Sequence, residues 1–347
     1  MLNKPVLFVL GAGAHMGLGM PGGADLIKII SGKTKRPNID NFYLGIVEQL
    51  ARDESIQSAP ERQNSFPRLC WDINQSLPYF ASVDDFLESK QSDDPALEKL
   101  VKSFIVYEIR RAERKCAFHQ EHDGTVSLID NVGRIKRVNK DADFWMLDLF
   151  KILSKGITRD NLENIFNNLQ IMNFNYDRCF ELFMTMCLME TYGIERREAV
   201  NLVNAIEHMR PYGQVAPFEG GVLADDDPAR IVELSNNIKT LSEGADEAYR
   251  DWVDTHLPEC AMAVFLGFGF HIQNTKLLTE KTLECTYEHI AISHMGISKK
   301  DIEFILDSEL NGTFFNNTDH LESHQYVLRE GSCSELLNDI TLRLRYL

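Results

Sequence analysis

Short apolar runs alternate with longer segments of helical spacing along this chain of 347 residues. The first run, Val6–Leu10, is uninterrupted, as expected of a strand covered on both faces of a parallel sheet. Ala261–Leu266 also resembles a buried strand, Leu169–Phe174 is a further sheet-like segment, and Glu284–Ile292 alternates weakly. These segments predict the strands of an α/β fold.

Between the predicted strands, apolar residues recur at the spacing of amphipathic helices. We therefore expect a Rossmann-like, doubly wound parallel sheet built by residues 1–35 and 169–347, with a mainly helical insertion at 36–168. Polar segments at 51–65, 119–141 and 219–228 predict loops. The predicted helices are Leu26–Ile30, Phe42–Leu50, Ala96–Ala117, Asp143–Leu153, Arg178–Thr191, Ala245–Thr255, Ser298–Leu306 and Leu336–Leu344.

A glycine-rich turn follows the first predicted strand, with Gly11, Gly13, Gly17 and Gly19 ahead of Pro21. A strand, a glycine turn and a helix together can present backbone N–H groups to a phosphate. The spacing is not GxGxxG, and no lysine follows as in a P-loop. The alternative is that the glycines serve tight turns only.

Polar residues also follow the later predicted strands. Asn175 and Asp177 come after Leu169–Phe174, where the carboxyl ends of parallel strands face a ligand crevice. They equally fit an Asx turn with an N-cap aspartate. After Ala261–Leu266 comes a third glycine turn that ends at His271, and a lone histidine is equally compatible with an ordinary loop.

The order of residues in the first turn resembles the sirtuin signature. Gly11-Ala12-Gly13-Ala14 and Gly19-Met20-Pro21 match it, whereas His15 stands where sirtuins carry serine. Gly22-Gly23-Ala24 replaces the Asp-Phe-Arg of the protein deacylases. This departure is similar to the sirtuin-like NADases of bacterial antiphage defence, of the type associated with HerA ATPases.

Two further segments add to this resemblance. Phe174-Asn175-Tyr176-Asp177 resembles a motif of sirtuin-like domains in which the asparagine is catalytic. Ser82-Val83-Asp84-Asp85 predicts a capping box at a helix start, and it is similar to a Ser-Ile-Asp-x-Phe-Leu stretch in these families. The resemblance implies that Asn175 is catalytic and that Asp177 either stabilises charge or orients Asn175.

The catalytic His-Gly motif of the family is altered, because Tyr212 precedes Gly213 and Arg210 occupies the alternative position. His208 lies two residues before Arg210 and shares its face on an extended segment, so we predict that it is catalytic; an ordinary surface residue is the alternative. The general base is therefore His208, His15 or His271. The residues that the resemblance implies for NAD binding are Gly11, Ala12, Gly13, Ala14, His15, Pro21, Tyr212, Gly267, Gly269 and His271.

The predicted function is an NAD glycohydrolase that uses NAD as substrate and depletes it in antiphage defence. The alternative is a catalytically impaired NAD- or ADP-ribose-binding subunit. The family analogy implies a homo-oligomer and a HerA-like ATPase partner. A protein deacylase is poorly supported, since only Cys260 lies where deacylases keep four zinc-binding cysteines, and we expect no metal.

The composition limits the partners and the cellular compartment that we expect for the protein. A formal charge of −16 argues against a broad nucleic-acid-binding surface, so we expect no direct nucleic-acid binding. The seven cysteines are dispersed without a CxxC pair, which is typical of reduced thiols. No apolar run is long enough to span a bilayer and no signal peptide is evident, so we expect a cytoplasmic protein.

Overall fold

A six-stranded parallel sheet forms the centre of the molecule, with the strand order β3-β2-β1-β4-β5-β6. The computed structural model describes residues 2–52, 66–90, 95–116, 144–219, 227–240, 243, 246–279, 287–315 and 321–346. The strand order β3-β2-β1-β4-β5-β6 defines a doubly wound fold and confirms the predicted α/β class. The strands are β1 (Val6–Leu10), β2 (Leu169–Asn173), β3 (Glu207–Met209), β4 (Met262–Leu266), β5 (His289–Ser293) and β6 (Tyr326–Arg329).

The three central strands are fully buried and in register. Leu10, the last residue of β1, pairs with Asn173 of β2 on one side and with Leu266 of β4 on the other. Every residue of these strands is buried, as the continuous apolar runs of β1 and β4 predicted, and β2 also buries the polar residues Gln170 and Asn173. The turns that follow β1, β2 and β4 therefore leave the sheet at the same level, and the strand order reverses between β1 and β4.

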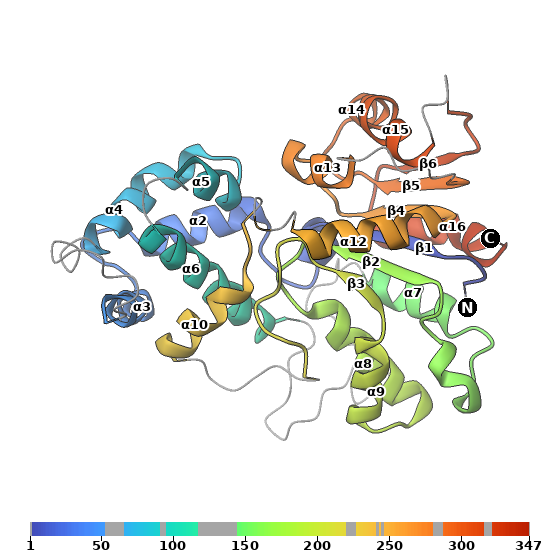
Figure 1. Cartoon of the computed structure of the whole chain (residues 1–347), viewed down its shortest axis with the longest axis horizontal. Coiled ribbons are helices and arrows are strands. Elements are labelled where there is room, and N and C mark those ends of the chain that lie inside the picture. The colour runs from blue at the N-terminus through green and yellow to red at the C-terminus, as the bar shows by residue number, and fades with distance from the viewer. Residues whose placement is uncertain are drawn as a thin grey trace.

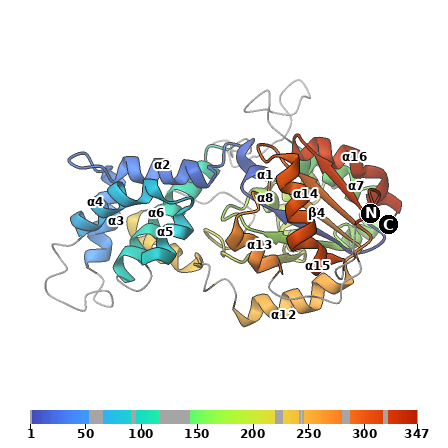
Figure 2. The same ribbon diagram turned by 90° about the horizontal axis from the view of Figure 1, so that it is seen from above.

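Helices cover both faces of the sheet (Figures 1 and 2). Helix α7 packs against α8 and α16 on one face, and α9 packs against α8. Figure 2 shows α12, α13 and α15 on the opposite side from α7 and α16. The bounds are α7 (Trp145–Leu153), α8 (Cys179–Tyr192), α9 (Arg196–Asn204), α12 (Glu247–His256), α13 (Ile272–Thr279), α14 (Lys299–Ile305), α15 (Asn311–Phe314) and α16 (Cys333–Tyr346).

A separate group of helices lies beside the sheet, at the left of Figures 1 and 2. We call it the helical unit. Its core includes Tyr43, whose ring stacks on Phe104 with 3.8 Å between centroids. The members are α2 (Gly23–Lys33), α3 (Asn41–Ala51), α4 (Phe66–Ser76), α5 (Val83–Lys90), α6 (Pro95–Glu113) and α10 (Pro228–Leu234).

The packing differs from the predicted insertion at both of its ends. Helix α2 precedes residue 36 but packs on α4 and α6, and α10 comes late in the chain but packs on α3 and α6. Helix α7 lies inside 36–168 yet covers the sheet. Sequence order alone does not reveal these contacts, because an amphipathic helix has the same pattern whichever core it faces.

Most predicted elements are confirmed within a few residues. Elements that the pattern did not predict are α1 (Gly13–Met16), α4, α9, α10, α13, α15, β3 and β6. The strands β3 and β6 are short and lie at the sheet edges, where they are partly exposed and carry a weak apolar signal. The amide of Asp85 donates to Ser82 Oγ over 3.0 Å, which confirms the predicted cap of α5. Most of the three predicted loops lies outside the described residues.

Candidate functional site

The turn after β1 is in direct backbone contact with the turn after β4. Gly11 donates its amide to the carbonyl of Leu266 over 3.0 Å, and Gly13 donates to Gly267 over 2.9 Å. A β-carbon on Gly11 would lie 2.5 Å from the carbonyl oxygen of Gly267. Gly267 itself has φ of +56°, and a β-carbon there would overlap the backbone of Ala14. These glycines are required by the contact between the two turns, a reason that differs from the expected close approach of a pyrophosphate.

The amides of the first turn already have partners inside the protein. Besides Gly11 and Gly13, Ala14 donates to the Gly11 carbonyl over 3.0 Å, and His15 donates to the Ala12 carbonyl over 3.2 Å. Ala12 and Gly13 are nevertheless exposed to solvent, and Pro21 lies half-exposed between α1 and α2. A phosphate at this turn would share or replace existing hydrogen bonds, so the expected anion cradle stays a prediction.

A buried polar cluster joins the first turn to the turn after β2. His15 Nδ1 lies 2.8 Å from Asp177 Oδ1. Asn175 donates from Nδ2 to the carbonyl of Gly11 over 3.0 Å, and the same nitrogen lies 3.4 Å from His15 Nδ1. All three side chains are buried. The structure thus brings together three residues that were predicted from two separate motifs.

Asp177 is held as a carboxylate in this cluster. Burial by itself would raise its pKa, but His15, the amide of Cys179 and the Arg210 guanidinium together hold the pKa well below its ordinary value. An ionised Asp177 accepts a hydrogen bond from His15 Nδ1–H, so Nε2 is the ring nitrogen that the carboxylate does not engage. That Nε2 is buried and has no hydrogen-bond partner among the described residues.

Trp145 of α7 covers the other side of His15. Its indole Nε1 donates to the carbonyl of Ala14 over 2.8 Å, and its ring lies parallel to the imidazole, with 6.2 Å between centroids. Sequence reasoning missed this residue, because it lies 130 positions from His15 and an apolar helix carries no signal of which side chain it contacts. The tryptophan fixes the turn and the plane of the imidazole together.

Arg210 supports the cluster from β3's end. Its Nη1 donates to the carbonyls of Asn175 over 2.6 Å and of Asp177 over 3.0 Å. Its Nη2 donates to Glu181 Oε1 over 2.5 Å. Burial would raise the pKa of the Glu181 carboxyl, but Arg210 keeps it lowered. Arg210 therefore holds the backbone that carries the two polar side chains.

His208 lies on the same side as Arg210, as predicted for residues i and i+2, and both side chains contact Glu181. Its Nδ1 is 3.4 Å from Glu181 Oε1, and its ring packs edge-on against Phe180. Burial and the nearby Arg210 charge lower its pKa to about 3. A base this weak accepts a proton poorly near neutral pH. Within the described parts of the chain, no hydrogen bond joins His208 to Asn175 or Asp177, so the geometry favours His15 as the base.

An open cleft of about 1000 Å³ lies between α5 and the turn after β4. Tyr212 lines it and donates to Asn274 Oδ1 over 2.5 Å, and His271 also lines it. Phe270 in its wall has φ of +50°, an outlier for a bulky residue, and such strain gathers at functional sites. A β-carbon on Gly269 would lie 3.3 Å from the His271 ring. The cleft thus contains two of the predicted NAD-binding residues.

Aromatic side chains connect this cleft to the polar cluster. Phe174 packs against Phe268 with 5.0 Å between centroids and against Tyr212 with 5.9 Å. Tyr176, which lies between the cluster residues Asn175 and Asp177 in sequence, is 6.3 Å from Tyr212 by the same measure. The cleft and the cluster are therefore neighbouring parts of one candidate site.

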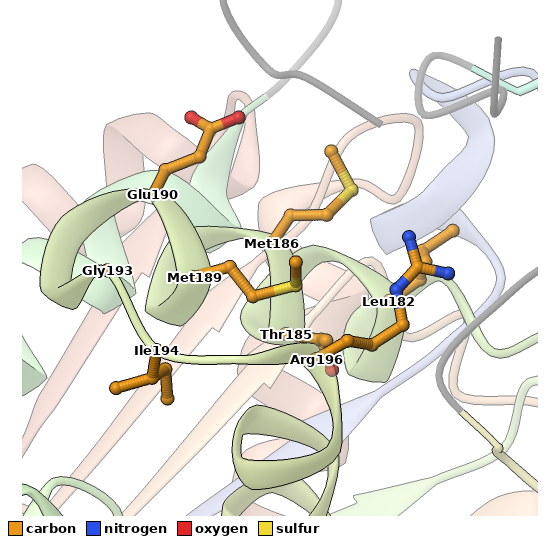
Figure 3. A pocket seen from close by; sticks show the side chains of 8 residues that line it. All are labelled: Leu182, Thr185, Met186, Met189, Glu190, Gly193, Ile194 and Arg196. Atoms are coloured by element: carbon orange, nitrogen blue, oxygen red, sulfur yellow. The ribbon is translucent and has the colours of Figure 1, made fainter. Parts of the chain in front are cut away.

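A second cavity of about 350 Å³ lies between α8 and the loop that leads to α9 (Figure 3). Figure 3 shows that thioether and aliphatic side chains form much of its wall. None of the predicted site residues lines it. Its lining residues are Leu182, Thr185, Met186, Met189, Glu190, Gly193, Ile194 and Arg196. We therefore place the candidate site at the cluster and the open cleft.

A buried ion pair connects α6 of the helical unit to the turn after β2. Arg178 Nη2 lies 2.6 Å from Glu113 Oε2, and Glu113 Oε1 accepts from the Arg178 amide over 2.8 Å. Burial by itself would lower the pKa of Arg178, but the Glu113 carboxylate outweighs this effect and raises the pKa of Arg178. No local spacing signals this pair, because its members are 65 positions apart.

Fold and site together define a doubly wound α/β protein with a His-Asp-Asn cluster at the carboxyl ends of β1 and β2. No family model matches the chain, and no curated protein matches it. Among the described residues, no group of three or more histidine, cysteine, aspartate or glutamate residues is arranged to hold a metal ion. In the same residues, no helix is long and apolar enough to cross a membrane.

Proposed function

We propose that the protein is an NAD glycohydrolase, which cleaves NAD to nicotinamide and ADP-ribose. The observation that carries the proposal is the buried His15–Asp177 pair beside Asn175, at the carboxyl ends of β1 and β2 and next to the β1–β4 position where the strand order reverses. In open α/β sheets this position is the usual ligand site. A histidine oriented by a carboxylate is a general base in many enzymes.

The reaction demands little nucleophilic force. Nicotinamide leaves as a neutral molecule, and positive charge develops on the ribose. A water molecule then forms its bond to the anomeric carbon and loses a proton, which His15 Nε2 accepts. Asp177 holds the ring in the required tautomer and stabilises the imidazolium that forms. Asn175, fixed by the Gly11 carbonyl, orients the water or a ribose hydroxyl.

We further propose that this activity depletes NAD in antiphage defence, as the sirtuin-like resemblance implies. Uncontrolled NAD hydrolysis would kill the host, so the enzyme must be inactive until it is triggered. Control through a homo-oligomer and a HerA-like ATPase fits a chain of net charge −16, which suits a basic partner surface. This assignment of partners is an analogy with the family.

A second function is favoured by the depth of the cluster. His15 is 1% and Asp177 is 3% exposed. A substrate water has limited access to such a pair unless the surrounding turns move. A protein that binds NAD or ADP-ribose through the cleft, without cleaving it, is the corresponding alternative.

Nicotinamide release from NAD by the purified full chain tests the proposal, alone and with a HerA-like ATPase. We expect release by the wild type and its loss in Asn175→Ala. The matched control is Asn167→Ala, an exposed asparagine whose amide bonds only to Asn164 among its described neighbours. ADP-ribose binding without release under either condition would favour the binding protein. Neither binding nor release would contradict both functions.

A further inference from the structure

Helix α5 carries a carboxylate from the helical unit to the candidate site. Asp84, in the first turn of α5, accepts a hydrogen bond at Oδ1 from the Tyr176 hydroxyl over 2.9 Å. Tyr176 stands between Asn175 and Asp177 in the turn after β2. The helical unit is thereby connected to the turn that bears two residues of the polar cluster.

The same carboxylate lines the open cleft. Around it are groups that accept or donate hydrogen bonds, among them Asn274 and the hydroxyl of Tyr212. Asp85 and Glu88 also line the cleft, and Lys276 contributes one positive charge. With three carboxylates on one side, this wall disfavours a phosphate and favours a hydroxyl donor or a cation. The volume of about 1000 Å³ is sufficient for a nucleoside.

The position of Asp84 is electrostatically unfavourable for the protein alone. Burial raises the pKa of its carboxyl to about 6, and the hydrogen bond from Tyr176 only partly opposes this effect. A carboxyl kept in a cleft under such conditions is a common feature of functional sites. The strained Phe270 in the same wall is a second, independent feature of this kind.

We propose that Asp84 is a further substrate-binding residue, whose carboxylate accepts hydrogen bonds from the diol of the nicotinamide ribose. The proposal rests on the proposed NAD-cleaving function. Tyr176 holds one carboxylate oxygen in place, and the ribose lies between Asp84 and the Asn175 side of the site. The sequence around Asp84 then has a role beyond the start of a helix.

A purely structural role for Asp84 would consist of its bond to Tyr176. The two roles differ in what they predict for the substrate. If the role of Asp84 is structural, its substitution should weaken the binding of every ligand alike. If Asp84 binds the diol, its substitution should weaken the binding only of ligands that carry the hydroxyls. Tyr176→Phe removes the protein bond and keeps the carboxylate, so it separates the two.

The test uses carbocyclic NAD, whose glycosidic bond does not break, and its 2′,3′-dideoxy form. Calorimetric titration of the wild type should show the diol form binding about tenfold or more tightly than the dideoxy form. Asp84→Asn should bind both forms with the weaker affinity. Tyr176→Phe should keep most of the discrimination, as should the matched control Asp251→Asn, an exposed aspartate of α12 that does not line the cleft.

Equal losses for both ligands in Asp84→Asn would overturn the proposal, as would a wild type without discrimination. Nicotinamide release is measured on the same proteins with NAD. The wild type could release no nicotinamide while Asp84→Asn loses the discrimination between the two analogues. This combination would support diol binding and contradict only the hydrolase. A wild type that binds neither analogue would contradict both proposals together.

Discussion

Two aspartates of the candidate site lie in opposite environments. Asp177, in the polar cluster, is surrounded by His15, an amide and Arg210, and its pKa is held well below the ordinary value. Asp84, in the open cleft, has a tyrosine hydroxyl as its partner, and burial raises its pKa to about 6. Both are withdrawn from bulk water, so the difference comes from the positive groups beside one and not the other.

Pairs of carboxyls with such different environments commonly divide the work of a site. Asp177 is ionised throughout the physiological range and can orient a base. Asp84 sits where a ligand can supply the hydrogen bonds that the protein does not. The cluster is thus suited to chemistry, and the cleft is suited to binding.

The largest effect is expected from removing the base of the cluster. His15→Gln should lower the rate of nicotinamide release about 10²–10⁴-fold, because glutamine cannot accept the proton of the attacking water. NAD affinity should change much less. Initial rates and KM from a nicotinamide-release assay check this, with thermal unfolding to verify the fold. A rate within threefold of the wild type would contradict the assignment of His15.

The contact between the first and third glycine turns provides the next test. Gly267→Ala should lower the free energy of unfolding by about 2–4 kcal/mol in the absence of any ligand, from backbone strain and overlap. Gly269→Ala is the matched control, since its β-carbon would meet only the His271 ring at 3.3 Å. Urea unfolding measures both variants. Similar, small losses in the two would contradict a backbone contact as the reason for Gly267.

Asp84 should impose a pH dependence opposite to that of Asp177. A carboxyl with a raised folded-state pKa stabilises the protein below its unfolded pKa, and this contribution is lost as pH rises from about 4 to about 6. The lowered pKa of Asp177 gives stability that is present above pH 4 and is lost at lower pH.

Asp84→Asn should therefore abolish a decline in stability between pH 4 and pH 6. The displacement from 3.8 to about 6 corresponds to about 3 kcal/mol, and solvent at this half-buried site reduces the expected decline to about 1–2 kcal/mol. Urea unfolding of wild type and variant at several pH values measures it. Parallel stability curves for the two proteins would contradict the raised pKa.

The smallest effect is expected at the other buried histidine. His208→Gln should change nicotinamide release by less than about threefold, because the His208 ring is already uncharged near neutral pH and faces Glu181. The same assay as for His15→Gln provides the measurement. A loss as large as that of His15→Gln would move the base from the first turn to β3.

Part of this site could be predicted from the sequence. Apolar runs that end in glycine or polar residues indicate the carboxyl edge of a parallel sheet, and this reasoning found Asn175 and Asp177, whereas His15 was found through the sirtuin-like resemblance of the first turn. It did not show that His15 pairs with Asp177, because that contact spans 162 positions. It placed His208 on the correct side of β3, but burial and the Arg210 charge that lower its pKa are properties of the folded protein.

Other features depend entirely on tertiary packing. Glycines 11 and 13 have the same sequence pattern whether they approach a pyrophosphate or the backbone of Gly267, and only the fold separates these reasons. Trp145 and Arg210 carry no local signal of their roles beside His15 and Asn175. The positions of the helices along the sequence were predicted more successfully than the core that each helix covers.

The central claim is that His15 and Asp177 act as one unit in NAD cleavage. Nicotinamide release by His15→Gln, Asp177→Asn and the double variant tests it most directly. The account predicts that the double variant is no slower than the slower single variant, within about threefold, since residues that act together are not additive. Losses that multiply in the double variant, or a wild type that releases no nicotinamide, would contradict it.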